Sequence, residues 1–318
     1  MFYSISMPDS KFYNDIPIID VLPLSEGYRE NSASKEIGNA CRDIGFFYVI
    51  NHGIPIDHQI TVLRDSSDFF KSSLEQKNLI STKNHSFYSG YVPFHGEKTK
   101  GKLDYHEAFD MIKESPLNHL GVVARHPARG PNQWPYWMKT FKGTMLKNWN
   151  LMEQLGNNIT KGIFLSLGLE EQLMKDYMGD PISMQRILYY PKSFKEEQGI
   201  GAHRDYGFVT MVMQDREGLE VKTRDDSWIK VKQMPNSFIV NIGWMVQTWT
   251  NDLYLATEHR VLIQENDRIS VVFFIGPSPY INISPLESCC SQENPPKYKS
   301  YNYGDYVKRK MKESYVND

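Results

Sequence analysis

The feature that most constrains the fold is a succession of short, strand-like runs after Pro181. Turn-forming residues separate these runs, as at Asp225-Asp226 and at Glu265-Asn266-Asp267. Many short strands separated by turns are typical of a double-sheet barrel or jelly roll. This part of the chain is therefore expected to be mainly β. The predicted strands are 185–190, 208–214, 218–222, 228–232, 237–243, 259–263 and 268–275.

The residues before Pro181 predict a mixed α and β region followed by helices that flank the β core. Helices are expected over 34–45, 57–73, 132–167 and 170–177, because apolar residues recur at helical spacing and glycines follow two of these segments. A long loop is expected over 87–110, and a last helix over 303–315. These patterns divide the chain into a mixed α/β segment 1–120, a helical segment 121–180, a jelly-roll core 181–280 and a C-terminal loop and helix 281–318.

The composition is that of an ordinary globular protein, with 318 residues and a formal net charge of -2. This charge gives no electrostatic footprint for nucleic acid or an anionic membrane, and no apolar run is long enough to span a bilayer. The N-terminus does not resemble a signal peptide, and three cysteines are too few for a disulfide framework. We therefore expect a cytoplasmic protein, monomeric by default, that acts on a small molecule.

Three residues indicate a metal site. His203 and Asp205 form an H-x-D triplet, and His259 follows about fifty residues later. Two histidines and one carboxylate on one side of a metal make the facial triad of non-haem Fe(II) oxygenases, which leaves coordination positions open. Residues two apart in a strand point to the same face, so His203 and Asp205 can share a metal while Arg204 points away.

Other interpretations of this set remain open. An H-x-D triplet can occur by chance, and His259 could be a histidine that merely packs near a turn. Three protein ligands can also hold a catalytic zinc, although the helical H-E-x-x-H pattern of many zinc enzymes is absent. A metal-storage protein on a cupin-like barrel is a third, non-catalytic possibility.

A second constellation follows the third candidate ligand. Arg268 and Ser270 share one strand face, and Arg268 lies nine residues beyond His259. A guanidinium and a hydroxyl can together hold one carboxylate deep in a pocket, and the phenol of Tyr190 could add a hydrogen bond. The alternative is a structural ion pair of Arg268.

At these residues the chain resembles the isopenicillin N synthase-like family of Fe(II) and 2-oxoglutarate dependent dioxygenases. The resemblance covers nearly the whole chain, and its motifs are specific in combination. They are Ile16-Pro17-Ile18-Ile19-Asp20, Gly45 to Ile54, Gly201-Ala202-His203-Arg204-Asp205-Tyr206-Gly207, Gly218-Leu219-Glu220-Val221, Asn241-Ile242-Gly243, Trp249-Thr250-Asn251, His259-Arg260-Val261 and Arg268-Ile269-Ser270.

The resemblance implies a double-stranded β-helix core that uses Fe(II), 2-oxoglutarate and O₂. His203, Asp205 and His259 match the iron ligands, which are also the catalytic residues. Arg268 and Ser270 match the pair that holds the far carboxylate of 2-oxoglutarate, with Tyr190 assisting. The implied reaction oxidises an unactivated C–H bond of a small molecule, by hydroxylation or desaturation, and releases succinate and CO₂.

Two rival functions remain at this point. The first is an Fe(II) oxidase of the same fold that uses no 2-oxoglutarate, in which Arg268 and Ser270 would hold the main substrate. The second is a non-catalytic module that binds a metal or a small acid, against which the intact triad argues.

Three positions depart from the family pattern, namely Leu188, where many members have Asn, Arg204, where Thr is usual, and Trp244, where many have Asp. They affect the expected details of cosubstrate and substrate binding. Aromatic side chains near the triad or on the long loop are candidates for the substrate wall, with core packing as the alternative. These candidates are Tyr206, Phe208, Phe274, Tyr91 and Phe94, with Tyr88 beside them.

Overall fold

The computed structural model describes residues 12–13, 15–25, 27, 31–84, 87–124, 126, 128–194 and 198–316. Two β-sheets form its centre, one with ten strands and one with four. The larger sheet has the order β1 (Phe12–Tyr13), β2 (Ile16–Asp20), β3 (Phe46–Ile50), β14 (Phe238–Ile242), β11 (Val209–Gln214), β16 (Arg268–Gly276), β9 (Ile182–Tyr190), β7 (Glu107–Glu114) and β4 (Gly90–Val92), with β8 (Arg129–Gly130) beside β7. The smaller sheet has the order β10 (Gln198–His203), β15 (His259–Leu262), β12 (Leu219–Lys222) and β13 (Trp228–Lys230).

Strand β16 lies in the middle of the larger sheet, between β11 and β9. Its side chains alternate between the two faces, as a pleated strand requires. Val271, Phe273 and Ile275 belong to the core under the helices, whereas Val272 belongs to the core between the two sheets. Arg268, Ser270 and Phe274 share the face of Val272, so the strand directs polar residues into the space between the sheets.

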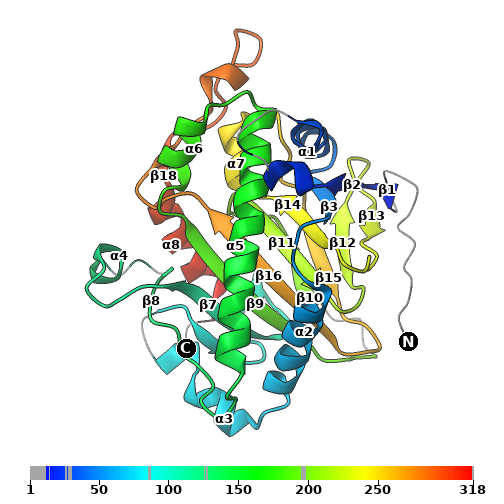
Figure 1. Ribbon diagram of the computed structural model, residues 1–318, viewed down its shortest axis with the longest axis vertical. Helices are drawn as coiled ribbons and strands as arrows, with labels where there is room; N and C mark the ends of the chain where they lie inside the picture. The colour runs from blue at the N-terminus through cyan, green and yellow to red at the C-terminus, as the bar shows by residue number, and fades with distance from the viewer. Residues whose placement is uncertain are drawn as a thin grey trace.

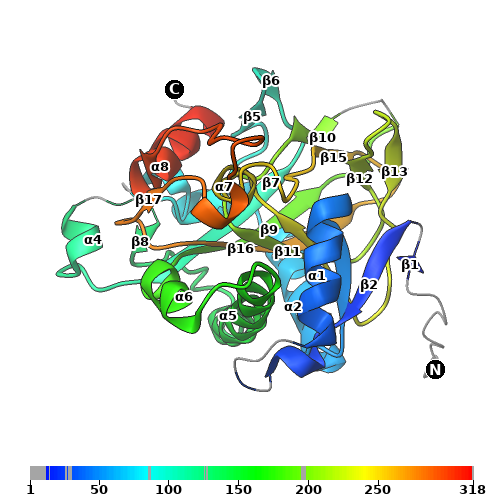
Figure 2. The same cartoon turned by 90° about the horizontal axis from the view of Figure 1, so that it is seen from above.

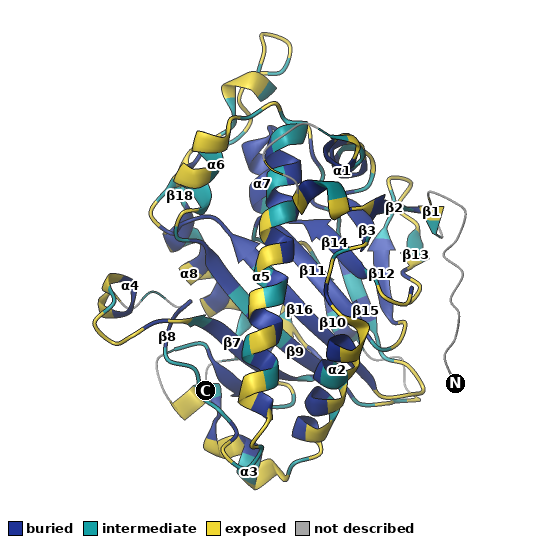
Figure 3. Cartoon of the chain, viewed as in Figure 1, coloured by how far each residue is buried: buried dark blue, intermediate teal, exposed yellow. Residues whose placement is uncertain are grey.

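The outer face of the larger sheet is covered by helices (Figures 1 and 2). The long helix α5 (Phe141–Ser166) crosses it, with α1 (Ser32–Asp43) and α2 (Ile56–Phe70) alongside. Trp149 of α5 packs edge-on against Phe273, with ring centroids 4.9 Å apart. Figure 3 shows α5 with buried residues toward the sheet and exposed residues along its outer side, as expected of an amphipathic helix.

Local signals explain where the first helix begins and ends. The side chains of Asn31 and Ser34 form a reciprocal capping box at the start of α1. Gly45 follows the helix with φ 69°, a conformation that glycine adopts without strain. A Cβ atom at Gly45 would lie 1.9 Å from the Leu255 carbonyl oxygen, so the chain needs glycine here for a second reason.

The predicted elements agree with the structure in their main course and differ in several places, including the following three. The helix predicted over 132–167 begins only at Phe141, and Pro135 disfavours helix at Trp134 within the predicted range. The predicted loop 87–110 contains β4, the hairpin of β5 (Lys98–Thr99) and β6 (Lys102–Leu103), and the start of β7. Strand β10 is an addition that the sequence pattern does not predict.

The N-terminal third contributes strands to both edges of the larger sheet. Strands β2 and β3 extend it beyond β14, and β7 and β4 extend it beyond β9. These strands between Phe12 and Glu114 therefore complete the same sheet that carries the core strands.

The remaining helices surround this framework. Helix α7 (Trp244–Trp249) and helix α8 (Tyr303–Ser314) lie on the side of the larger sheet opposite α5 (Figure 2). No helix in the described ranges combines the length and apolar character needed to cross a membrane. The other short elements are α3 (Leu74–Leu79), α4 (Leu120–Val123), α6 (Glu171–Met178), β17 (Asn282–Ile283) and β18 (Tyr301–Asn302).

Candidate active site

The three predicted metal ligands converge at one end of the space between the sheets. Strands β10 and β15 pair antiparallel with His203 opposite His259. The Nε2 atoms of His203 and His259 lie 3.5 and 3.7 Å from Oδ1 of Asp205. One donor atom from each residue lies within 4.8 Å of the others, a spacing that fits one metal ion.

Main-chain carbonyl groups orient both imidazoles. Nδ1 of His203 lies 2.7 Å from the Gly201 carbonyl oxygen, and Nδ1 of His259 lies 3.1 Å from the Thr257 carbonyl oxygen. Each Nδ1–H therefore donates to the backbone two residues earlier, which leaves the Nε2 lone pair free for a metal. Two imidazole nitrogens and one carboxylate oxygen are the donor atoms that iron requires in a two-histidine, one-carboxylate site.

Two side chains from neighbouring strands hold Asp205. Its Oδ2 accepts hydrogen bonds from Thr210 Oγ1 at 2.6 Å and from Asn241 Nδ2 at 2.7 Å. Thr210 and Asn241 are partners in the β11–β14 ladder, so the register of the sheet presents both donors together. With Oδ2 occupied, Oδ1 is the oxygen that faces the histidines.

Asp205 does not lie on a strand with His203, contrary to the expectation. His203 is the last residue of β10, and Asp205 belongs to the loop that follows. The Trp244 amide donates to the Asp205 carbonyl oxygen at 2.6 Å. A Cβ atom at Gly243 would lie 2.2 Å from the Gly207 carbonyl oxygen, so glycine allows the two loops to approach.

The charges of the site suit metal binding. Burial and, to a smaller extent, the charge of His203 lower the pKa of His259 to about 4. His259 is therefore neutral near pH 7, and a histidine must be neutral to bind a metal. Burial alone would raise the pKa of Asp205, but the histidines and the Asn241 hydrogen bond hold it well below its usual range. Asp205 is therefore ionised near pH 7 and can bind a cation.

The three residues predicted to hold a carboxylate, Arg268, Ser270 and Tyr190, also lie together in the structure. Arg268 is opposite Tyr190 in the β16–β9 ladder, and its guanidinium lies 4.9 Å from the centroid of the Tyr190 ring. Its Nη1 lies 3.4 Å from Ser270 Oγ, and its Nη2 donates to Gln214 Oε1 at 2.8 Å. Nothing in the sequence pattern points to Gln214, because the contact depends on the pairing of β11 with β16.

The Arg268 guanidinium is buried without a counter-ion. Only 2% of the residue is exposed, and no acidic side chain in the described ranges forms an ion pair with it. Burial lowers the pKa of Arg268, since the charged form loses its water. A buried cation that lacks an anion is costly, so the site fits the bound carboxylate of a cosubstrate.

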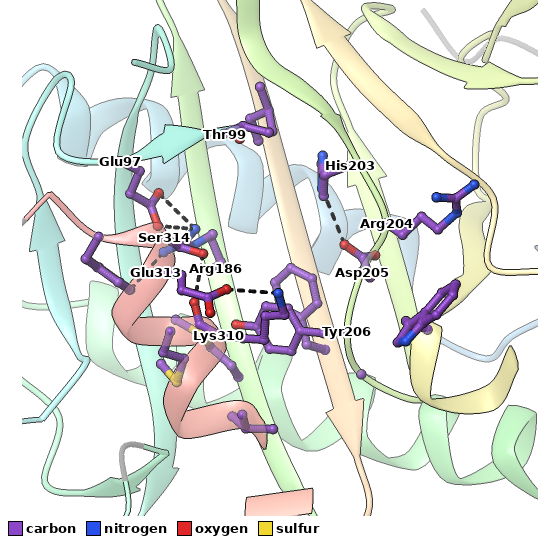
Figure 4. A pocket seen from close by; sticks show the side chains of 18 of the residues that line it. Glu97, Thr99, Arg186, His203, Arg204, Asp205, Tyr206, Lys310, Glu313 and Ser314 are labelled. Carbon is purple, nitrogen blue, oxygen red and sulfur yellow. Dashed lines mark hydrogen bonds and ion pairs between the residues drawn. The ribbon is translucent and has the colours of Figure 1, made fainter. Parts of the chain in front are cut away.

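A chamber of about 840 Å³ extends from the triad to helix α8. Figure 4 shows His203 and Asp205 on one side of it, and Glu97 and Arg186 on the other. Leu188 lines the chamber and is paired with Ser270 across β9 and β16, so it separates the chamber from the deeper Arg268 group. The Arg268, Ser270 and Tyr190 side chains themselves are not part of the chamber wall.

The predicted wall residues divide into two groups. Tyr206 and Phe274 line the chamber. Phe208 does not, because it is buried against Phe164 and Trp249 under the helices. Tyr91 and Phe94 do not line the chamber either, contrary to the prediction. Tyr91 packs in the core against Phe69 and donates a hydrogen bond to Glu107, and the Phe94 ring contacts His95 and Tyr105. Tyr88 contacts Tyr315 and does not line the chamber.

Two of the three family departures lie at the edge of the chamber near iron. Arg204 is exposed, and its Nε donates to the Ala256 carbonyl oxygen at 2.7 Å. In Figure 4 Arg204 extends away from Glu97 and Arg186, as predicted for the residue between the ligands. Trp244 lines the chamber and its ring meets Tyr298 edge-on.

The wall that faces the iron site is an ionic network that the sequence did not reveal. Arg186 donates through Nε and Nη2 to Asp110 at 2.7 and 2.6 Å, and through Nη1 to both oxygens of Glu97 at 2.9 Å. Its Nη2 also donates to the Tyr315 hydroxyl at 2.9 Å. All five N–H groups of this guanidinium are thereby used. Asp110 and Glu97 are the two carboxylates that this guanidinium pairs with.

The chain is similar to known oxygenases along nearly its whole length. Residues 16–136 match the family described as the N-terminal region of the non-haem dioxygenase in morphine synthesis, and residues 181–277 match the 2OG-Fe(II) oxygenase superfamily. Homoarginine-6-hydroxylase 2-ODD-233 of Oryza sativa subsp. japonica is 34% identical, over 96% of this chain and 98% of the relative.

Solved structures agree with this assignment. The crystal structure of JOX2 in complex with 2OG, Fe and JA has a TM-score of 0.78 and 28% identity, and covers 95% of this chain and 86% of that one. The crystal structure of a full-length Neurospora crassa protein in complex with alpha-KG has a TM-score of 0.80 and 25% identity, and covers 93% of this chain and 96% of that one. These neighbours have the double-stranded β-helix fold that the motifs implied.

The likeness to hydroxylases and to structures that hold 2-oxoglutarate and iron decides between the alternatives raised by the sequence. The cosubstrate is 2-oxoglutarate, with Fe(II) and O₂, rather than the zinc of a hydrolase or the iron of an oxidase without cosubstrate. The protein belongs to the 2OG-Fe(II) oxygenase superfamily and is a 2-oxoglutarate dependent hydroxylating dioxygenase.

Proposed function

We propose that this protein hydroxylates an unactivated C–H bond of a small organic molecule, with iron on His203, Asp205 and His259 and 2-oxoglutarate anchored by Arg268, Ser270 and Tyr190. The observation that carries the proposal is the convergence of three donor atoms within 4.8 Å of one another, together with the buried Arg268 guanidinium, which has no ion-pair partner among the described residues. Iron, 2-oxoglutarate and O₂, when bound, supply the oxidising chemistry, with release of succinate and CO₂.

The residues of the chain position the reactants. His203, Asp205 and His259 would hold Fe(II) through one donor atom each, and His203 and Asp205 line the chamber in which the substrate would bind. Arg268 and Ser270 fix the far carboxylate of the cosubstrate, and Leu188 lies between that group and the chamber. Phe274, Tyr206 and helix α8 line the reaction space and limit where a substrate can lie. No side chain has to act as a general base in this arrangement.

Anaerobic titration tests the proposal directly. Fe(II) added to the metal-free protein, followed by 2-oxoglutarate, is expected to give a weak visible charge-transfer band as the keto acid chelates the iron. The band should saturate at one 2-oxoglutarate per iron. Iron binding without any band would contradict the proposed arrangement of cosubstrate and metal.

Replacing Arg268 by lysine tests the carboxylate anchor. Lysine keeps the charge but cannot bind a carboxylate through two parallel hydrogen bonds, so the KM for 2-oxoglutarate should rise by about 10- to 100-fold. Succinate formation at varied 2-oxoglutarate concentration measures the change. Arg260→Lys is the matched control, because Arg260 pairs with Glu220 on the smaller sheet. An equal effect of both substitutions would argue against the anchor.

We also propose that the enzyme works as a monomer in the cytoplasm and does not act on nucleic acid or membranes. The near-neutral formal charge of -2 and the free thiols of Cys41, Cys289 and Cys290 support this proposal.

A further inference from the structure

Helix α8 covers the chamber with an amphipathic face that contains one lysine. Tyr303, Val307 and Met311 are buried on this face, and Tyr306, Lys310 and Ser314 are half-buried beside them at the same four-residue spacing. All six line the chamber. Lys310 is the one basic side chain among these six, so it brings a positive charge to the chamber from the half-buried flank of the helix.

Lys310 faces the side of the chamber that binds iron. Figure 4 shows Lys310 and Glu313 on α8, with Tyr206 next to Lys310 in this view, and His203 and Asp205 across the chamber. The Lys310 ammonium lies 2.9 Å from Glu313 Oε2, with the two side chains 37% and 53% exposed. An ion pair between such exposed partners on one helix contributes little to stability, because water screens it. A ligand carboxylate can therefore replace Glu313 at little cost.

The other cations of the chamber are less suited to bind a ligand. Arg186 has used all its donors on Glu97, Asp110 and Tyr315. Lys100 is paired with Glu258 at 2.5 Å. Arg204 donates to the Ala256 carbonyl oxygen and extends away from Glu97 and Arg186 in Figure 4. Arg309 lies over the Tyr306 ring, with 65% of its side chain exposed. Lys98 is exposed on the β5–β6 hairpin.

One side of the chamber is apolar, whereas the Arg186 network lines another side. Met184, Leu188 and Phe274, from β9 and β16, line the apolar side. A substrate that fits this shape has an apolar segment near the metal and an anionic group at α8. Electrostatic pairing at one end would set which carbon atom of the segment lies over the iron.

We propose that Lys310 is a specificity-determining residue that binds the carboxylate of the organic substrate, so that the enzyme selects small carboxylic acids over their neutral analogues. This inference rests on the proposed function and names its substrate class.

The test compares matched acids and amides. The panel contains homoarginine, jasmonic acid, and a series of straight-chain and aryl-substituted carboxylic acids, each with its primary amide, and succinate release above the substrate-free rate is measured. Acids should stimulate release and their amides should not. For the most active acid, Lys310→Gln should raise KM by about 10- to 100-fold with a smaller change in kcat, and Lys310→Arg should restore much of the loss.

Controls separate this role from general effects. Lys312→Gln alters an exposed lysine of the same helix and should leave KM unchanged. The charge-transfer band of iron and 2-oxoglutarate should be the same in Lys310→Gln and the original protein, whereas absence of the band in both would defeat the proposed function instead. The Lys310 proposal is overturned if amides match acids, if no acid in the panel stimulates release, or if Lys310→Gln weakens 2-oxoglutarate binding instead.

Discussion

Replacing His203 by alanine is expected to remove iron binding and to lower turnover by more than about a thousandfold, because the metal supplies several kcal/mol of the catalytic effect. The substitution removes one of three ligands, and neither Asp205 nor His259 can replace it from its fixed position. Metal content after dialysis and succinate formation measure the two effects.

The fold should survive this change. His203 ends β10 near the chamber, and its side chain is 29% exposed, so alanine opens no large cavity in the core. Circular dichroism and the urea midpoint should remain close to those of the original protein. His119→Ala is a suitable control, since His119 only caps the short helix α4. A His203→Ala protein that retains iron and full turnover would show that the metal is held elsewhere.

Replacing Arg186 by methionine is expected to lower the free energy of unfolding by about 3–5 kcal/mol. Asp110 is fully buried and Glu97 is 5% exposed, so the variant leaves two carboxylates without the cation that compensates their burial. Urea denaturation at pH 7 measures the loss. Arg64→Met removes an arginine that is 63% exposed beside Asp65 and should cost less than about 1 kcal/mol. Equal losses would mean that the Arg186 network adds nothing to stability.

The effect of Arg186→Met should depend on pH in a defined direction. Burial alone would raise the pKa of Glu97, but the charges of Arg186 and His106 lower it to about 2. A carboxyl group with a lowered folded pKa stabilises the protein above its unfolded pKa of about 4.3, and this contribution disappears as the pH falls toward 2. Without Arg186 the buried acids favour protonation. The stability difference between the two proteins should therefore be smaller at pH 4 than at pH 7.

Residue type and spacing identified the metal ligands, although the local geometry differed from the prediction. The H-x-D triplet and His259 were sufficient to predict a site, but Asp205 reaches it from a loop and not from the face of a strand. Thr210 and Asn241, which hold Asp205, were not predicted as a pair. Their contact depends on the register between β11 and β14, and the sequence of each strand alone does not contain that register.

The aromatic residues show a similar limit. Phe208 and Phe274 are both apolar residues near the triad, yet Phe208 packs under the helices and Phe274 lines the chamber. A sheet that is covered on both sides buries both of its faces, so hydrophobicity does not reveal which face holds the substrate. Helix α8 is different, because its four-residue periodicity alone places Lys310 on the inner side.

The two imidazoles are oriented by carbonyl groups of Gly201 and Thr257, which belong to the main chain and persist through any side-chain substitution. The geometry of the metal is thereby separated from the residues that shape the chamber, several of which come from a different part of the chain, helix α8. A lineage can exchange residues such as Lys310 or Trp244 and acquire a new substrate while its iron centre stays intact. This separation gives a physical reason why one scaffold can serve both a relative named as a homoarginine-6-hydroxylase and a structural neighbour solved in complex with JA.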